Sequence, residues 1–394
     1  MTEEIWNNQQ YRELTISWNQ AMCSRFENVF SQIRDMDSLT EQDLSDRVFK
    51  HSLDLMNKWY QEPSPREGLN NAEFISQIDD LKELISLAAT MSVYGEMIVP
   101  DLVIRSLEKF GDNSMDALVR EIMRADFEAC DDESEFDLPD YFDNVTIIMG
   151  SSMQDEDKKS EDCAIPACAG KSAAKPAASA GPAESGSDPV ADTDLETGAG
   201  SAPEPSDGIN PVPGEIDYAV CESQASQRIA ASFLTMIANS TAAIYIPLIV
   251  EKLAATNKPN IVIQEAAAQF LSGASYNSPA WLMEWLNETL ISREDLTDHP
   301  VIYLVMYAIA KAQHKGDKSG VLTLLLRTFD YMSEKAIGAG CLASFGDPRA
   351  MAFLKSWLHL NQNQIDEKTW HEFAMAIRRL GGKIDPAEHP NRFH

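Results

Sequence analysis

Histidine and cysteine are the residues through which this chain could most readily catalyse a reaction or bind a metal, and their spacing supports neither. Seven histidines are scattered between His51 and His394 without an HExxH pattern, and there is no glycine-rich phosphate loop or nucleophile elbow. Cys163 and Cys168 lie five residues apart with no second pair, so a zinc ion would lack ligands. We therefore expect no enzymatic activity, no catalytic residue, and no bound cofactor or metal.

One further group of chemically capable residues lies near the C-terminus. His359 and His371 are predicted on neighbouring helices and Arg378 and Arg379 follow closely, so a small site is conceivable there. The alternative, which we favour, is that these are exposed side chains of a last helical repeat, whose outer face must be polar. Cys341 lies on an apolar helix face, where a cysteine is usually a small core residue.

The corner between two short predicted helices at Gly346 best indicates the architecture. Glycine readily adopts the left-handed conformation that ends a helix, the Asp347 carboxylate can cap the next helix, and Pro348 suits its first position. Apolar side chains recur at helical spacing on both sides of this corner. Two short helices cannot bury their apolar faces alone, so the pair needs stacked neighbours.

Weaker copies of this corner recur at intervals of about 30 to 40 residues. A Gly-Asp pair is found again at Gly316 and Gly111, with predicted helices on both sides. The unit at 346–350, Gly-Asp-Pro-Arg-Ala after a helix of small residues, resembles HEAT-type repeats, including the short bacterial kind. The resemblance implies a HEAT-like α-solenoid of about five helix pairs over 215–394. An irregular helical bundle with coincidental corners is the alternative.

Composition divides the chain into three predicted domains and makes its fold class all-α. Residues 1–130 form a smaller helical domain, in which a capping pattern at Thr40 predicts a helix that ends before Pro63. Residues 131–214 are rich in Ala, Pro, Ser, Gly and acidic residues, so we expect a disordered acidic linker. Residues 215–394 form the helical-repeat domain. A long linker would let the two helical lobes act independently.

The candidate partner-binding site is an acidic segment with interleaved apolar residues. These apolar residues are Phe136, Leu138, Tyr141 and Phe142. The surrounding carboxylates would keep them solvated until a basic, grooved partner binds them. Two alternatives stay open: the aromatic rings could pack back onto the N-terminal lobe, or the linker itself could bind the partner. A calcium loop fits less well, because the glycine and ligand spacing of an EF-hand are missing.

The net charge of −30 argues against nucleic-acid binding, since neutralising phosphates needs clustered Lys and Arg. The acidity is uneven: residues 1–150 carry 31 acidic and 12 basic side chains, against 19 and 16 over 215–394. The nearly neutral C-terminal half shows no basic stripe. A protein partner with a basic surface would complement the acidic N-terminal half.

Residues 229–250 contain no charge and are long enough to cross a bilayer as one helix. Against a membrane span, the polar residues 239–241 lie in its middle and Pro247 near its end, which suits two helices joined by a corner. No basic cluster flanks the segment to set an orientation. The N-terminus shows no signal-peptide pattern, so we expect a cytoplasmic location.

Together these features predict a non-enzymatic scaffold or adaptor that uses helical repeats to bind another protein. One alternative is a membrane-associated adaptor that uses 229–250. Another is a lyase or chaperone acting on a bound chromophore or protein, which the resemblance to short HEAT-type repeats implies. No residue of this chain can be matched to a lyase site, so that alternative depends on the corner at 346–350 alone.

Overall fold

The computed structural model describes residues 5–32, 41–95, 99–129, 222–316, 318–361 and 364–384. Within these ranges every regular element is a helix and the only strand-like pairings are isolated bridges, so the all-α fold class is confirmed. The helices before residue 130 are α1 (Gln9–Gln32), α2 (Glu41–Gln61), α3 (Asn71–Ser76), α4 (Leu81–Tyr94), α5 (Asp101–Glu108) and α6 (Asp112–Arg124).

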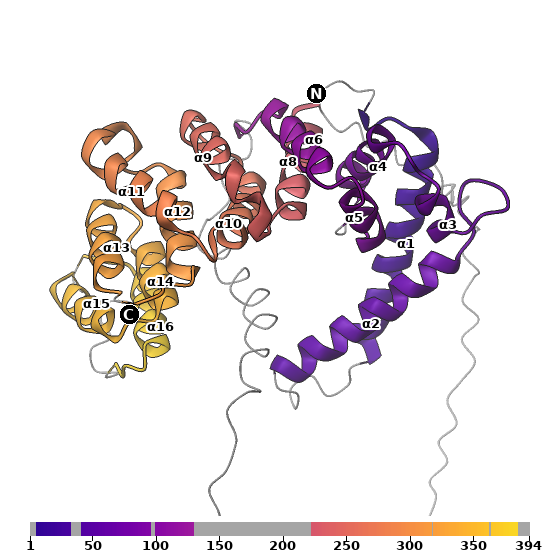
Figure 1. Cartoon of the computed structure of the whole chain (residues 1–394). Coiled ribbons are helices and arrows are strands. Elements are labelled where there is room, and N and C mark those ends of the chain that lie inside the picture. The colour runs from indigo at the N-terminus through magenta and orange to yellow at the C-terminus, as the bar shows by residue number, and fades with distance from the viewer. Residues whose placement is uncertain are drawn as a thin grey trace, which may run out of the picture. The chain divides into compact units, whose positions relative to one another are not determined.

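The helices after residue 221 alternate with short connections (Figure 1). They are α8 (Glu222–Met236), the 3-10 helix η5 (Ser240–Tyr245), α9 (Ile246–Ala255), α10 (Ile261–Ser275), α11 (Ala280–Ser292), the 3-10 helix η6 (Glu294–Leu296), α12 (Pro300–Lys311), α13 (Ser319–Tyr331), α14 (Lys335–Phe345), α15 (Pro348–Asn361) and α16 (Glu367–Arg379).

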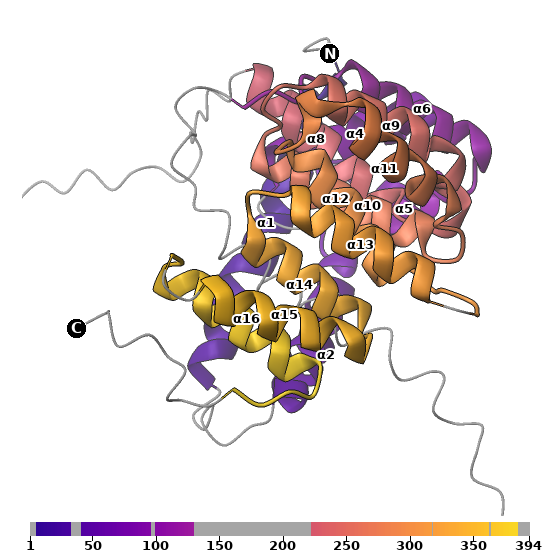
Figure 2. The ribbon, with the colours of Figure 1, turned by 90° about the vertical axis from the view of Figure 1, so that its left-hand side faces the viewer.

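These helices pack in two rows, visible in Figures 1 and 2. In the even row, α8, α10, α12, α14 and α16 each contact the next member. The odd row consists of α9, α11, α13 and α15. There Trp285 Nε1 of α11 donates a 2.9 Å hydrogen bond to Glu251 Oε1 of α9, and the Phe329 ring of α13 packs edge-on against Phe353 of α15. Every second helix is therefore a spatial neighbour.

Helix α12 lies at the centre of the apolar core. Every residue from Val301 to Ala310 is buried, because the sequence is apolar on all faces of this helix. It packs on α10 and α14 within the even row and on α9, α11 and α13 of the odd row. The helices around it need only one apolar stripe each, so they carry polar residues on their other faces.

The predicted corner at Gly346 is confirmed in each of its three parts. Gly346 has φ 73°, in the left-handed region, and ends α14. Asp347 Oδ1 accepts a 2.9 Å hydrogen bond from the backbone N–H of Arg349, and Pro348 is the first residue of α15. Gly111 and Gly316 also have positive φ, in keeping with the turns predicted there. The helix expected to end before Pro63 is α2, which ends at Gln61.

The parts of the chain before and after the 130–221 stretch are joined by direct contacts. Both α4 and α6 pack against α8. Lys252 Nζ of α9 donates to the carbonyl oxygens of Met123 and Ala125 at the end of α6, over 2.7 and 2.6 Å, and lies above the Phe127 ring. The described residues on the two sides of the 130–221 stretch belong to one compact unit. The division into the three predicted domains stays a prediction. The contacts described here join the helices before residue 130 to those after residue 221.

The uncharged segment 229–250 is not a single helix. Helix α8 ends at Met236, and Asn239 caps the next turn by accepting a hydrogen bond from Thr241 N–H over 3.1 Å. The polar residues therefore form the corner that the sequence favoured over a membrane span. Over the ranges that the structure describes, no helix combines the length and apolar character needed to cross a membrane. The candidate partner-binding residues of the acidic segment, Phe136, Leu138, Tyr141 and Phe142, lie outside those ranges.

Candidate functional site

The connections that follow α6, α9, α11 and α13 lie next to one another and form a continuous border of the helical array. The loop edge is our name for these connections, residues 125–129, 256–260, 293–299 and 332–334, together with the last turn of the helix that precedes each of them. Each is hydrogen-bonded to the next one along the border. Asn260 N–H donates to Phe127 O and Ala129 N–H donates to Lys258 O, both over 2.8 Å, with a bridge between Glu128 and Pro259.

The next two links of the loop edge use side chains. His299 Nε2 lies 2.6 Å from Thr256 O, and Ser333 N–H donates to Asp298 Oδ1 over 2.9 Å. The linked residues are 43 and 35 positions apart in the sequence, close to the predicted repeat interval. These bonds join successive connections.

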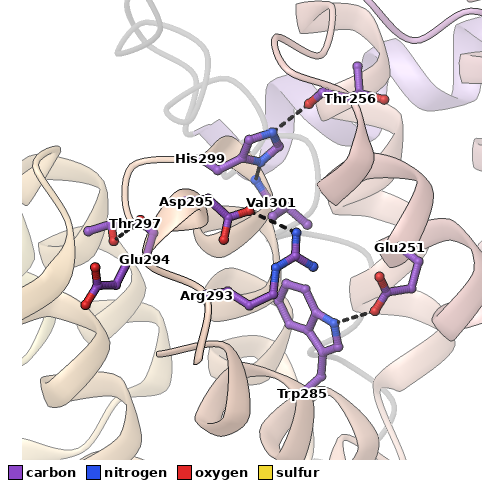
Figure 3. A network of polar contacts seen from close by, with 9 residues as sticks. All are labelled: Glu251, Thr256, Trp285, Arg293, Glu294, Asp295, Thr297, His299 and Val301. Atoms are coloured by element: carbon purple, nitrogen blue, oxygen red, sulfur yellow. Dashed lines mark hydrogen bonds and ion pairs between the residues drawn. The ribbon is translucent and has the colours of Figure 1, made fainter. Parts of the chain in front are cut away.

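His299 performs two structural tasks at once (Figure 3). Its Nδ1 accepts a 3.2 Å hydrogen bond from Val301 N–H and so caps α12, while Nε2 points to Thr256 O at the end of α9. Because the backbone oxygen can only accept, the proton must be on Nε2, which makes the ring a neutral imidazole. Its two nitrogens are both engaged, so His299 is a positioning group rather than a general base.

The charged groups beside His299 form short local pairs (Figure 3). Arg293 Nη2 lies 3.1 Å from Asp295 Oδ2, and this hydrogen bond lowers the pKa of the Asp295 carboxyl. Both side chains are exposed, so the pair adds little stability. Trp285 Nε1 and Glu251 Oε1 join α11 to α9 on the inner side of the same border. This network orients loops and contains no nucleophile next to a base.

A shallow depression opens where the loop edge meets the ends of α11 and α13. Its free volume of about 20 Å³ is enough for one water molecule or one small group. Its wall contains both apolar and polar side chains, namely Thr289, Leu290, Arg293, Glu294, Leu296, Thr297, Ile302 and Tyr331. A depression of this size is too small for a cofactor or a metabolite, and suits the tip of one side chain from a larger partner.

Two half-buried charged side chains lie in the even row. Burial raises the pKa of Glu265 on α10 to about 7. Lys311, at the end of α12, has its ammonium group 5.6 Å from the centre of the Tyr307 ring, and burial, followed by the nearby Arg379, lowers its pKa. Both groups titrate differently from exposed ones, but neither is joined to a second reactive group by a hydrogen bond among the described residues.

The C-terminal residues considered for a small site are separate surface side chains. His359 and His371 are both exposed, and His371 Nε2 lies 3.7 Å from Glu367 Oε1 on its own helix. Cys341 is buried, as expected for a small core residue, and its burial raises the thiol pKa to about 12. No group of three His, Cys, Asp or Glu residues within the described ranges is arranged to hold a metal ion.

His299, Glu265 and the exposed apolar side chains of the loop edge were not predicted from the sequence. His299 could have been found, because it directly precedes Pro300 and so stands where a helix cap is needed. Glu265 could also have been found, as the only charge between Ile261 and Leu271. The exposed apolar side chains carry no such local signal, since an apolar residue on a helix is normally assigned to the core.

Comparisons of this chain with protein-family models, with curated proteins and with solved structures found no match.

Proposed function

We propose that this protein is a non-catalytic scaffold in which stacked helix pairs present the loop edge to a protein partner. The observation that carries the proposal is the regular series of cross-links between connections. Thr256 to His299 and Asp298 to Ser333 join successive connections of the loop edge over 43 and 35 residues, and Ser319 to Arg349 joins the first turns of α13 and α15, at the opposite border, over 30 residues. Such near-regular spacing is typical of a solenoid, in which each unit contacts only its neighbours.

The HEAT-like character of this stack is part of the proposal. It is supported by the alternation of even and odd rows and by the Gly-Asp-Pro corner between α14 and α15. The stack includes α6, which takes the place of an odd-row helix before α8 and whose following connection starts the loop edge. Helical-repeat proteins typically use extended surfaces of this kind to bind other proteins.

The loop edge is favoured as the binding surface because it is both rigid and partly apolar. Ile291, at the end of α11, is 66% exposed and Tyr331, at the end of α13, is 44% exposed. The backbone beneath these two side chains is already ordered, so covering them with a partner costs side-chain entropy there but no backbone entropy. Aromatic anchors beside a small depression are frequent at the centre of protein interfaces.

Site-specific photocrosslinking tests this proposal. A photoreactive amino acid is placed at position 291 on the loop edge or, as a matched control, at position 244, where Ile244 is 75% exposed in η5, just before α9. The full chain is irradiated in cells of its source. We expect one or a few proteins to crosslink from 291 and not from 244. Absence of any protein crosslink from 291 would contradict the proposal.

A further inference from the structure

The apolar part of the loop edge lies among acidic side chains. Glu294 lines the depression, Glu288 precedes Ile291 by three residues on α11, and Glu334 follows α13 in the next connection. All three are exposed. The structure gives none of these carboxylates an ion pair with a cation in the described part of the chain.

The nearby cations are already engaged. Arg293 pairs with Asp295, and Arg327 Nη1 donates to Asn287 Oδ1 over 3.2 Å. Lys335 Nζ donates to the carbonyl oxygens of Phe329 and Asp330 at the end of α13, over 2.6 and 3.1 Å. Arg327 and Lys335 keep their positive charge in these bonds, but the segments 284–299 and 327–335 together carry seven acidic and three basic side chains. The exposed apolar residues therefore lie in a part of the loop edge with an excess of negative charge.

From this arrangement we infer that the loop edge between α11 and α13 binds a basic amphipathic segment of a partner protein. Apolar side chains of that segment cover Ile291 and Tyr331, and its Lys or Arg residues face Glu288, Glu294 and Glu334. Helical peptides commonly bind in this way, through a few anchors on one face. Opposite charges at the rim determine partner choice and association rate more than affinity.

This inference rests on the proposed function and specifies its partner by chemical class. An acidic helix is disfavoured, because like charges would meet at the rim. A neutral apolar helix would leave the three carboxylates without partners. The small depression beside Tyr331 limits the central anchor to the tip of one side chain, so most of the contact area comes from the exposed residues around it.

The probe is a short fluorescein-labelled helical peptide of leucine and lysine in an amphipathic pattern, titrated against the full chain by fluorescence anisotropy. Its control is the same pattern with glutamate in place of lysine. We expect Ile291→Ser/Tyr331→Ser to weaken binding of the basic peptide at least about tenfold. Ile244→Ser replaces an even more exposed isoleucine away from the loop edge and should leave the affinity unchanged. Thermal unfolding checks that each variant is folded.

A second variant tests the charges. Glu288→Lys/Glu294→Lys should weaken the basic peptide and reduce the salt dependence of its binding. Unchanged affinity in both double variants would overturn the inference, because the peptide would then bind to other acidic parts of the chain. Equal affinity for the glutamate peptide, or no binding to the wild type, would also overturn it. If crosslinks still form from position 291 in either case, the scaffold function stands and only the partner class is wrong.

Discussion

Gln227 Nε2 donates a 2.6 Å hydrogen bond to the backbone oxygen of Glu128, although the two residues are 99 positions apart. Gln227 is buried, and its Oε1 accepts from Asn260 Nδ2 over 3.1 Å. The side-chain amide of Gln227 thus joins α8 to two connections of the loop edge, 125–129 and 256–260. Glu128 and Gln227, which precede and follow the 130–221 stretch, are therefore direct neighbours.

Replacing Gln227 should therefore weaken the junction of the two helical parts. Gln227→Ala leaves Glu128 O and Asn260 Nδ2 without this partner, and we expect a loss of about 1 to 3 kcal/mol in the free energy of unfolding. Gln224→Ala, on an exposed position of the same helix, should cost less than about 0.5 kcal/mol. Urea unfolding of both variants measures the difference, and equal costs would contradict the role of this amide.

His299 should matter for stability through both of its ring nitrogens. His299→Ala removes the cap of α12 and the link to Thr256, so we expect a loss of about 1 to 3 kcal/mol by urea unfolding. His299→Asn keeps a capping oxygen and should recover part of this loss. The control is His371→Ala on the exposed face of α16, with an expected change below about 0.5 kcal/mol. A similar loss for His299→Ala and His371→Ala would refute the capping role.

Substitutions at Gly346 and at Gly340 should change the stability of the protein in opposite directions. A Cβ atom at Gly346 would meet no neighbour within 4 Å, so the cost of adding this atom comes from the φ of 73°. We expect Gly346→Val to destabilise the protein by about 1 kcal/mol or more, and Gly346→Asn by less, since Asn tolerates this conformation. Gly340 has equally open surroundings inside α14, where Gly340→Ala should stabilise by up to about 1 kcal/mol. Calorimetric unfolding temperatures distinguish these outcomes.

Glu265 should make stability depend on pH between about 4.5 and 7. Burial raises its pKa from 4.5 to about 7 in the folded chain, so the folded state binds the proton more tightly than the unfolded state. This contribution is fully present below pH 4.5 and is lost as the pH rises through 7. Its size is on the order of 1 kcal/mol, because the half-exposed carboxyl is partly screened by solvent.

The test compares wild type with Glu265→Gln by urea unfolding at pH 5 and pH 8. The variant should lose less stability over this interval, since glutamine does not titrate. Glu288→Gln, at an exposed position of α11, is the matched control, and its stability should change with pH as that of the wild type does. If the stability of Glu265→Gln falls as steeply as that of the wild type, another group is responsible for the pH dependence.

The sequence was sufficient for features that depend on neighbouring residues. Gly346, Asp347 and Pro348 could be assigned individually, because the end of one helix and the start of the next are set by local backbone preferences. The break within 229–250 was foreseen for the same reason. The contact of Gln227 with Glu128 could not be foreseen, because it depends on how helices stack across a long intervening stretch rather than on any local pattern.

The candidate site shows the same division. The acidic residues near Ile291 can be found in the sequence. Whether they lie on one surface depends on the bonds between successive connections, such as that from Ser333 to Asp298. The predicted site at Phe136 to Phe142 lies outside the described residues and stays a prediction. Helical periodicity shows which residues belong to one helix face, and it does not show which helix ends meet at one border.

The central claim is that the helices before residue 130 and after residue 221 form one continuous array. The most direct measurement uses a site-specific protease sequence inserted after Gly181, followed by complete cleavage and native size-exclusion chromatography. We predict that the two fragments elute together and unfold in a single transition that matches the uncut protein, because Gln227, Lys252 and the bonds between 127–129 and 258–260 still hold them. Separation into two fragments that unfold independently would contradict the account.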